Sequence, residues 1–152
     1  SRAGDVEILR GIDLTVRSGE RVGIVGPSGS GKSSLLMVIG GMERASAGTV
    51  RLLGEELGGL DEDRLARLRR DHVGVVFQTF HLIPTMTALE NVATPLELAR
   101  RADAFDRAAG MLDEVGLGHR GDHYPAQLSG GEQQRVALAR ALAPHPALLL
   151  AD

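Results

Sequence analysis

The chain has 152 residues, of which 43% are hydrophobic and 24% are charged. This is long enough for one compact domain with a real core and too short for two ordinary domains. The formal net charge of −3 comes from interleaved arginine and acidic residues, which excludes the basic face that a nucleic-acid-binding protein needs. The chain has no cysteine, which excludes a disulfide framework and a thiolate metal site and suits the cytosol.

The uninterrupted apolar runs are short. The longest cover residues 35–39 and 147–151, far below the length that spans a membrane. No signal-like segment is found at the start of the sequence. Any membrane role is therefore expected to come through another chain or through a part of the protein outside this sequence.

Short strands and one helix are predicted for the first quarter of the chain. The apolar runs at residues 6–9 and 12–16 predict two strands, which a Ser-Gly turn follows. Residues 21–25, Arg-Val-Gly-Ile-Val, are apolar and rich in β-branched side chains and predict a buried strand. Residues 32–39 contain no helix breaker and predict a helix that ends at the glycine pair after them.

The loop between this strand and this helix has a phosphate-binding motif. It reads Gly26-Pro27-Ser28-Gly29-Ser30-Gly31-Lys32-Ser33 and fits G-x-x-x-x-G-K-[ST] without a mismatch. Sixteen of the seventeen basic residues are arginines, and the remaining one is Lys32. An ammonium on a flexible stem can fold over a phosphate pair as a point charge, which a planar guanidinium cannot do equally well. The motif predicts that the chain binds a nucleotide.

The position of the loop suits that chemistry. Its backbone N–H groups and the helix N-terminus can point together at a triphosphate. Ser33 is expected to place its hydroxyl on Mg²⁺, and Ser34 offers a second donor near the phosphates.

The middle of the chain predicts strand, helix and strand in turn. Residues 49–53 lie between two glycines and predict a strand. Residues 61–70 predict a charged helix with two leucines on one face. Residues 73–77 predict the next strand, and Gln78 lies at its end.

The last part of the chain is mostly helical. Residues 87–116 and residues 129–143 each begin with a capping box of the form [ST]-x-x-E. Prolines stop the second helical stretch, and the apolar run at residues 147–151 predicts a strand that ends on Asp152. The elements together predict an α/β protein with a helical insertion at about residues 79–128.

Asp152 has the arrangement of a Walker B aspartate. An apolar strand buries its side chains, and the carboxylate emerges at the carboxyl edge of the sheet near Mg²⁺. A strand that ends in aspartate is common and more often carries a merely solvated carboxylate. The phosphate-binding loop in the same chain favours the metal role for Asp152.

The run Leu128-Ser129-Gly130-Gly131-Glu132-Gln133-Gln134-Arg135 indicates a second anion-binding terminus. Ser129 is expected to cap a helix whose first turn, with two glycines, exposes N–H groups and the positive end of the helix dipole. The alternative is an ordinary capped helix start. One phosphate loop already covers a nucleotide from one side, so a second such terminus needs another γ-phosphate.

At this point the sequence resembles the ATP-binding cassette (ABC) family, whose signature motif begins Leu-Ser-Gly-Gly. Gln78, in Val76-Phe77-Gln78-Thr79-Phe80, resembles the family's Q-loop glutamine. The resemblance implies a P-loop NTPase core made of residues 1–78 and 129–152, with a mixed sheet and N-terminal antiparallel strands. It also implies a helical subdomain, residues 79–128, inserted between the Q-loop and the signature motif.

The resemblance also implies roles for individual residues. Lys32, Gln78 and Asp152 would be catalytic, and Mg²⁺ would be held by Ser33, by the Gln78 amide oxygen and, through water, by Asp152. ATP would lie on the phosphate loop of one subunit, in contact with the signature motif of a second cassette in a head-to-tail dimer. The nucleotide-binding set is then Gly26, Pro27, Ser28, Gly29, Ser30, Gly31, Lys32, Ser33, Ser34 and Gln78, with Ser129, Gly130 and Gly131 contacting the ATP of the partner.

Within the family the sequence is most similar to cassettes of the lipoprotein-releasing and macrolide-export type. The similar runs are Ile39-Gly40-Gly41-Met42, Leu68-Arg69-Arg70 and the eleven residues from Leu82 to Val92. The resemblance implies an energy-coupling ATPase of an exporter or lipoprotein-extraction system, bound to a separate membrane permease at the cytoplasmic face. The apolar residues Leu82, Ile83 and Met86 would then lie near the permease groove or, alternatively, belong to the core.

The family pattern is incomplete in this sequence. In the family a glutamate follows the Walker B aspartate, and a D-loop and a switch histidine come later, whereas this sequence stops at Asp152. The adenine-stacking aromatic expected just before Ser1 is also absent. Two interpretations are open: a piece of a longer ATPase, truncated at the Walker B aspartate, or a true fragment that binds nucleotide and hydrolyses it very slowly.

Three other functions are alternatives to transport. A DNA-repair or chromosome-maintenance ATPase carries a coiled coil between these motifs, whereas Gln78 and Ser129 are only 51 positions apart and have no heptads between them. A ribosome-associated switch would need a second cassette and more basic charge. In a plain P-loop kinase the signature-like run would be coincidental.

Overall fold

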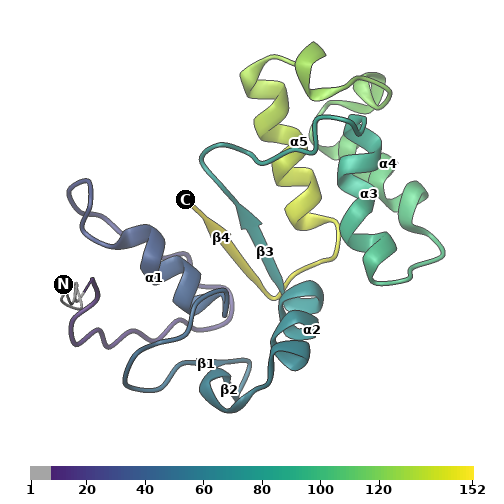
Figure 1. Ribbon diagram of the computed structural model, residues 1–152. Coiled ribbons are helices and arrows are strands. Elements are labelled where there is room, and N and C mark those ends of the chain that lie inside the picture. Colours follow the sequence, from purple (N-terminus) through teal and green to yellow (C-terminus); the bar gives the residue numbers. More distant parts are fainter. Residues whose placement is uncertain (1–7) are drawn as a thin grey trace, which may run out of the picture. The chain divides into compact units, whose positions relative to one another are not determined.

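Figure 1 shows the computed structural model of the chain, in which residues 8–152 are described. The chain divides into two compact units, Ser1–Gly59 and Leu60–Asp152. The strand predicted at residues 6–9 lies partly outside the described residues, and its last two residues are not in a strand. The expected division into an ATPase core and an inserted helical subdomain stays a prediction.

The first unit contains one α-helix and one small hairpin. Helix α1 is Lys32–Ile39, as predicted, and it ends where the N–H of Gly40 donates to the carbonyl of Leu36. Gly41 follows with a φ of 68°, a left-handed conformation that glycine adopts at little cost. The sequence therefore placed both ends of this helix correctly.

The hairpin of the first unit was only half predicted. The strand expected at residues 49–53 is reduced to β1 (Arg51–Leu52), which pairs antiparallel with β2 (Glu55–Glu56), and the 3-10 helix η1 (Leu57–Gly59) follows. Leu53 and Gly54 form the two-residue loop with φ values of 52° and 84°. Positive φ at both loop positions matches the twist of paired strands, so Gly54 was the signal for the missed strand.

The strands predicted at residues 12–16 and 21–25 are not found as strands. Their apolar side chains are largely exposed, and Val25, predicted to be buried, is 92% exposed. A strand exists only when its N–H and C=O groups pair with a neighbour, and an apolar run alone supplies no such partner. Among the described residues of the first unit, the ladder is that of β1 and β2.

The second unit combines four α-helices with a pair of strands. Its helices are α2 (Glu62–His72), α3 (Ala88–Leu98), α4 (Ala104–Glu114) and α5 (Gly130–Leu142), with the 3-10 helices η2 (Gly118–Arg120) and η3 (Pro125–Gln127). Its strands are β3 (Val73–Val76) and β4 (Leu148–Ala151). The predicted order of elements is confirmed for this unit.

The helix starts of this unit follow from their capping residues. Asp61 accepts a hydrogen bond from the N–H of Arg64 at the start of α2. Thr87 and Ser129 begin α3 and α5 with complete capping boxes, in which the cap side chain and the third helical residue bond each other's backbone. Both capping boxes were predicted from the sequence.

Strands β3 and β4 run parallel, with Val73 opposite Leu148 and Val76 opposite Ala151. Helix α5 lies against β3 at Gly74, where a side-chain carbon would be 2.5 Å from the carbonyl oxygen of Ala141. Only glycine allows this approach of helix to strand. The small residue therefore fixes the position of α5 on this pair of strands.

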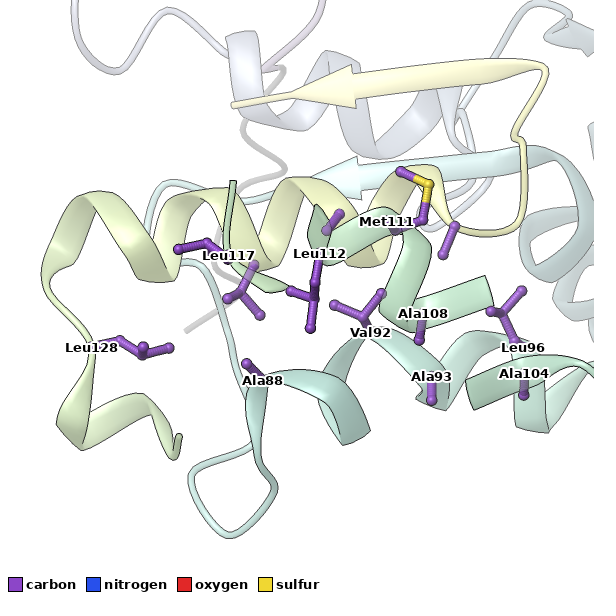
Figure 2. Close-up of a cluster of buried hydrophobic side chains, with 13 residues drawn as sticks. Ala88, Val92, Ala93, Leu96, Ala104, Ala108, Met111, Leu112, Leu117 and Leu128 are labelled. Carbon is purple, nitrogen blue, oxygen red and sulfur yellow. The ribbon is translucent and has the colours of Figure 1, made fainter. Parts of the chain in front are cut away.

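The hydrophobic core of the second unit lies among α3, α4 and α5, which pack side by side (Figure 1). Figure 2 shows aliphatic side chains from all three helices converging in this space. Full burial of each larger side chain stabilises the fold by about 1.5–3 kcal/mol. The cluster is Ala88, Val92, Ala93, Leu96, Ala104, Ala108, Met111, Leu112, Leu117, Leu128, Val136, Ala139 and Ala143.

Candidate nucleotide-binding site

The phosphate loop has the backbone conformation that its glycines allow. Gly29 and Gly31 have φ values of 78° and 87°, in the left-handed region. At Gly31 a side-chain carbon would also lie 3.0 Å from a methyl carbon of Ile8 and 3.2 Å from its carbonyl oxygen. Gly31 is therefore required twice, by its conformation and by the space around it.

The Lys32 side chain folds back over the loop. Its ammonium Nζ donates to the carbonyl oxygens of Gly26 at 2.9 Å and Pro27 at 2.7 Å. Both are ordinary hydrogen-bond distances for a charged donor. The loop thus holds a positive charge on its concave side, with three donor hydrogens that phosphate oxygens can accept in place of the carbonyls.

The start of α1 is open to an anion. Its N-cap, Gly31, makes no side-chain capping bond, and the described first turn contains no acidic residue. The positive end of the helix dipole is therefore not neutralised by a carboxylate. A pocket of about 290 Å³ lies here, lined by Leu9, Ile12, Ile24, Val25, Gly26, Pro27, Ser30, Gly31, Lys32 and Leu35.

In the second unit, Gln78 and Asp152 lie at the same edge of the β3–β4 pair. The backbone N–H of Asp152 donates to the carbonyl of Val76 at 3.0 Å. Gln78 follows Val76 by two residues, and it is exposed. Ligands of parallel sheets bind outside the carboxyl ends of the strands, which is where both residues are found.

A tight turn presents Gln78. The N–H of Phe80 donates to the carbonyl of Phe77 at 2.9 Å, so Gln78 and Thr79 are the two central residues of the turn. The ring of His81 stacks on that of Phe77, with centroids 4.9 Å apart. Phe80 and His81 have φ values of 59° and 46°, a left-handed conformation that costs a non-glycine residue about 1–2 kcal/mol.

Helix α5 holds this turn through Arg140. Its guanidinium donates to the carbonyl of Phe80 through Nη2 and to that of His81 through Nη1, both at 2.8 Å. Burial lowers the pKa of the Arg140 guanidinium, which nevertheless stays charged. Nothing in the sequence distinguished Arg140 from the other arginines, and it was not predicted as a site residue.

Helix α3 holds the next part of the same loop through Asn91. The Asn91 side chain is fully buried, and its Nδ2 donates to the carbonyls of Ile83, Met86 and Thr87 at 3.0–3.1 Å. Its Oδ1 accepts from the N–H of Ile83 at 2.8 Å. A polar residue on the apolar face of a predicted helix indicates a buried side chain that hydrogen-bonds to nearby backbone, so the sequence contained a signal for Asn91.

For the apolar residues near this loop, the sequence allows two locations, the core or the permease groove. Leu82 is partly buried and packs against the helical core, so it belongs to the core. Ile83 and Met86 are half-buried, and their backbone is held by Asn91. Their function at a permease groove stays a prediction.

The signature-like run lies at the start of α5. Ser129 Oγ accepts from the N–H of Glu132 at 3.3 Å and donates to its carboxylate at 2.8 Å. Side-chain carbons added at Gly130 and Gly131 would meet no described atom within 4 Å. Packing within the described chain therefore does not explain these glycines, whereas close approach of an external group would.

Charge around this helix start is balanced. The N–H and hydroxyl of Ser129 hold the pKa of the Glu132 carboxyl below its usual range, and Arg120 lowers it further. Arg120 Nε lies 3.4 Å from Glu132 Oε1. A newly bound anion would have to compete with this carboxylate for the hydrogen that the Ser129 hydroxyl donates.

The predicted residues therefore fall into three local groups. The loop residues Gly26 to Ser34 are together at the start of α1, Gln78 and Asp152 share one strand edge, and Ser129 to Gly131 form the start of α5. The predicted joint metal site of Ser33, Gln78 and Asp152 takes residues from both units and stays a prediction. Among the described residues, no group of three or more His, Cys, Asp or Glu side chains could hold a metal ion.

The motifs and their geometry agree with comparisons to known proteins. The ABC transporter family matches residues 9–152, so the chain belongs to this family. Membership of the family implies nucleotide binding. No helix within residues 8–152 has the length and apolar character needed to cross a membrane.

Two curated relatives and one solved structure show how near the match is. The chain is 56% identical to lipoprotein-releasing system ATP-binding protein LolD 2 of Caulobacter vibrioides, over 100% of this chain and 68% of the relative. It is 52% identical to ABC transporter ATP-binding protein YbbA of Escherichia coli (strain K12), over 97% of this chain and 66% of the relative.

The solved structure is the dimeric, post-hydrolysis state of the ATP-binding cassette MJ0796 bound to ADP and Pi. It matches with a TM-score of 0.89 and 45% identity, over 95% of this chain and 65% of that chain. The expected P-loop NTPase fold of an ABC cassette is thereby confirmed. The chain spans about two thirds of the length of the proteins it matches.

Proposed function

We propose that the chain is the ATP-binding part of an energy-coupling ATPase subunit of an ABC membrane transporter. The observation that carries the proposal is the Lys32 ammonium, folded over the Gly26 and Pro27 carbonyls at a helix start without a side-chain cap. Residues 26–34 bind the phosphates through backbone N–H groups, hydroxyls and this ammonium. Hydrolysis is assigned to the whole protein, because the chain spans about two thirds of its relatives.

Magnesium is the metal that the proposed ligands suit. The Ser33 hydroxyl, the Gln78 amide oxygen and the Asp152 carboxylate, the last through water, are all oxygen donors, which Mg²⁺ prefers. When bound, the ion neutralises charge on the phosphates. Gln78 is proposed to orient the attacking water, and Asp152 is proposed to hold the ion through water. The position of Asp152 directly after β4 supports this assignment.

A second cassette completes the proposed site. Ser129, Gly130 and Gly131 contact the ATP on the phosphate loop of the partner in a head-to-tail dimer. The open space around both glycines supports this assignment, as does the dimeric state of the matched MJ0796 cassette. The cycle then runs from ATP-bound closure of the dimer to opening after hydrolysis.

The transporter partner is a separate membrane permease, which holds the subunit at the cytoplasmic face of the membrane. Export or lipoprotein extraction is the proposed direction, supported by the name of the Caulobacter vibrioides relative. Both curated relatives are ATP-binding proteins of transport systems, which favours transport over the DNA-repair, ribosome-associated and kinase alternatives.

Nucleotide titration tests the proposal directly. The dissociation constant of magnesium-ATP is measured for the wild type, Lys32→Ala and Lys32→Arg. We expect the alanine variant to bind about 100-fold more weakly, because a charge-assisted pair of phosphate bonds is lost. Arginine is expected to restore little, since its planar fork does not fit inside the loop. Unchanged affinity in Lys32→Ala would overturn the proposal.

Coupling to transport is tested on the whole protein. Its ATP hydrolysis is measured alone and together with a candidate permease in lipid nanodiscs. Stimulation by the permease supports the transporter function. Equal rates with and without any membrane partner contradict it.

A further inference from the structure

Arg140, which has no role in the proposed function, holds the turn that contains Gln78 through hydrogen bonds. Arg140 donates to two successive backbone carbonyls, those of Phe80 and His81, at 2.8 Å each. Its sequence separation from them is 59 and 60 residues, so the contact is tertiary. A guanidinium fork suits two neighbouring carbonyls because its N–H groups diverge in one plane.

The two hydrogen bonds from Arg140 are made at a strained part of the backbone. Phe80 and His81 are consecutive non-glycine residues with left-handed φ values, a conformation that persists only when the surroundings impose it. The two carbonyls that Arg140 binds belong to these two residues. Phe80 also closes the turn around Gln78 through its own N–H. Loss of the guanidinium therefore releases the strained pair and, with it, the turn.

The same contact joins two parts of the proposed machinery. Arg140 lies on α5, which begins directly after Ser129, and one continuous helix connects them. Ser129 is proposed to contact the partner's nucleotide, and Gln78 the subunit's own nucleotide. Helix α5 and the Arg140 contacts therefore form a continuous physical connection between the Ser129 end and the Gln78 turn.

We propose that Arg140 is a positioning residue for Gln78, which fixes the turn of residues 77–81 and links it to the helix of the signature motif. This inference rests on the proposed function of Gln78 in hydrolysis. Its structural half, that Arg140 holds the turn, is independent of that function. The two halves are therefore tested by different readouts on the whole protein.

The variants are chosen to separate positioning from stability. Arg140→Ala removes the fork, and Arg140→Lys keeps the charge but can reach only one carbonyl well, so it serves if the alanine variant folds poorly. Arg107→Ala is the matched control. Arg107 is also half-buried, and its Nε donates to the carbonyl of Ala143 at 2.6 Å, just beyond the end of α5 and away from the turn.

Amide hydrogen exchange tests whether Arg140 holds the turn. The N–H groups of Phe80 and His81 are hydrogen-bonded within the turn, to Phe77 and Thr79. We expect Arg140→Ala to speed exchange of both amides by about 10-fold or more, and Arg140→Lys to do so by less. Arg107→Ala should leave both amides unchanged. Equal protection in Arg140→Ala and the wild type would overturn the proposal.

Steady-state ATP hydrolysis tests whether Arg140 positions Gln78 for catalysis. We expect Arg140→Ala to lower kcat by about 10- to 100-fold, because the Gln78 amide is misplaced. The KM for ATP should change by less than about twofold, because the phosphate loop is untouched. Arg107→Ala should keep the wild-type kcat when each protein is assayed the same number of degrees below its own Tm.

A double-mutant cycle decides whether Arg140 acts through Gln78. In a Gln78→Ala background, adding Arg140→Ala should cause no further loss of kcat. Multiplied losses, or a raised KM with unchanged kcat, would show an independent or merely structural role and overturn the proposal. If Gln78→Ala alone hydrolyses normally, the catalytic role of Gln78 fails, whereas the exchange result still decides whether Arg140 holds the turn.

Discussion

The backbone N–H of Asp152 donates to the carbonyl of Val76, which fixes the end of β4 beside the end of β3. The bond is made by the main chain of Asp152 and not by its carboxylate. Asp152 and Gln78 are therefore brought to one strand edge by the parallel register, in which Val76 lies opposite Ala151. We therefore expect the strand register to persist when the carboxylate is replaced.

The first prediction concerns the Asp152 carboxylate. In Asp152→Asn the strand pairing is expected to persist, because the ladder bond belongs to the backbone. The Mg²⁺ dependence of nucleotide binding should be lost, because a neutral amide is a poor partner for the water shell of the ion. Titrations of ATP with and without Mg²⁺ measure this dependence.

Asp71→Asn is the control for this variant, because Asp71 pairs with Arg70 at 2.7 Å on α2 and has no proposed metal role. Its Mg²⁺ dependence should equal that of the wild type. A wild-type metal response in Asp152→Asn would remove Asp152 from the proposed metal site.

The second prediction concerns Gly74. Alanine there would place its Cβ 2.5 Å from the Ala141 carbonyl oxygen and 3.0 Å from the Pro146 ring, so α5 must move away from β3. We expect Gly74→Ala to destabilise the protein by about 2–4 kcal/mol, as overpacking against a rigid backbone does. Urea unfolding measures the loss.

Gly110→Ala provides the opposite case. Gly110 lies in the interior of α4, and a Cβ there would meet no described atom within 4 Å. Alanine should stabilise the helix by about 0.5–1 kcal/mol because it lowers the entropy cost of the helical backbone. Equal effects of the two substitutions would contradict the close approach at Gly74.

Local signals in the sequence predicted the second unit well. The capping boxes at Thr87 and Ser129 predicted two helix starts, and the prolines after residue 143 predicted where the second helix ends. These features depend on residues close together in the chain. Their physical cause is therefore visible in a short stretch of sequence.

Features that depend on distant partners were predicted less well. The apolar run at residues 21–25 predicted a buried strand, but its partners are not specified by the run itself, and it is not a strand in the structure. Arg140 resembles any exposed helical arginine until the fold brings Phe80 and His81 to it. The motif residues of the phosphate loop were predictable because one short segment contains both the conformation and the chemistry.

The third prediction concerns the buried Asn91. Alanine there would leave the N–H of Ile83 and the carbonyls of Ile83 and Met86 without the bonds that the side chain now supplies. We expect Asn91→Ala to lower the free energy of unfolding by about 2–4 kcal/mol, because unpaired buried polar groups are costly. Thermal and urea unfolding measure it.

Thr94→Ala is the matched control on the same helix. Its hydroxyl donates back to the carbonyl of Glu90 within α3 at 2.8 Å and also lies 3.6 Å from the sulfur of Met86, two contacts that add little to stability. A change below about 0.5 kcal/mol is expected. If Asn91→Ala were equally mild, water would have to replace the side chain, and the loop would not depend on Asn91.

The last prediction concerns acid and the capping box of α5. The hydrogen bonds from Ser129 hold the pKa of Glu132 below the ordinary value of 4.5. A carboxyl with a depressed pKa in the folded state stabilises that state above its unfolded pKa, and this contribution disappears as the pH falls through the folded pKa. Glu132→Gln keeps an acceptor for the Ser129 N–H but does not titrate. The stability advantage of the wild type over Glu132→Gln should therefore be constant near neutral pH and shrink below about pH 4.5.

Denaturant unfolding of both proteins from pH 3 to pH 7 tests this expectation. Asp71 and Asp103 also have pKa values lowered by neighbouring arginines, so both proteins lose stability in acid for that reason. The difference between the two proteins isolates Glu132, because the other carboxyls are common to both. A difference that grows toward acid would mean that Glu132 has a raised pKa and repels the helix start. Such a result would contradict the capping geometry at Ser129 and, with it, the ordered helix start that is proposed to contact the partner's nucleotide.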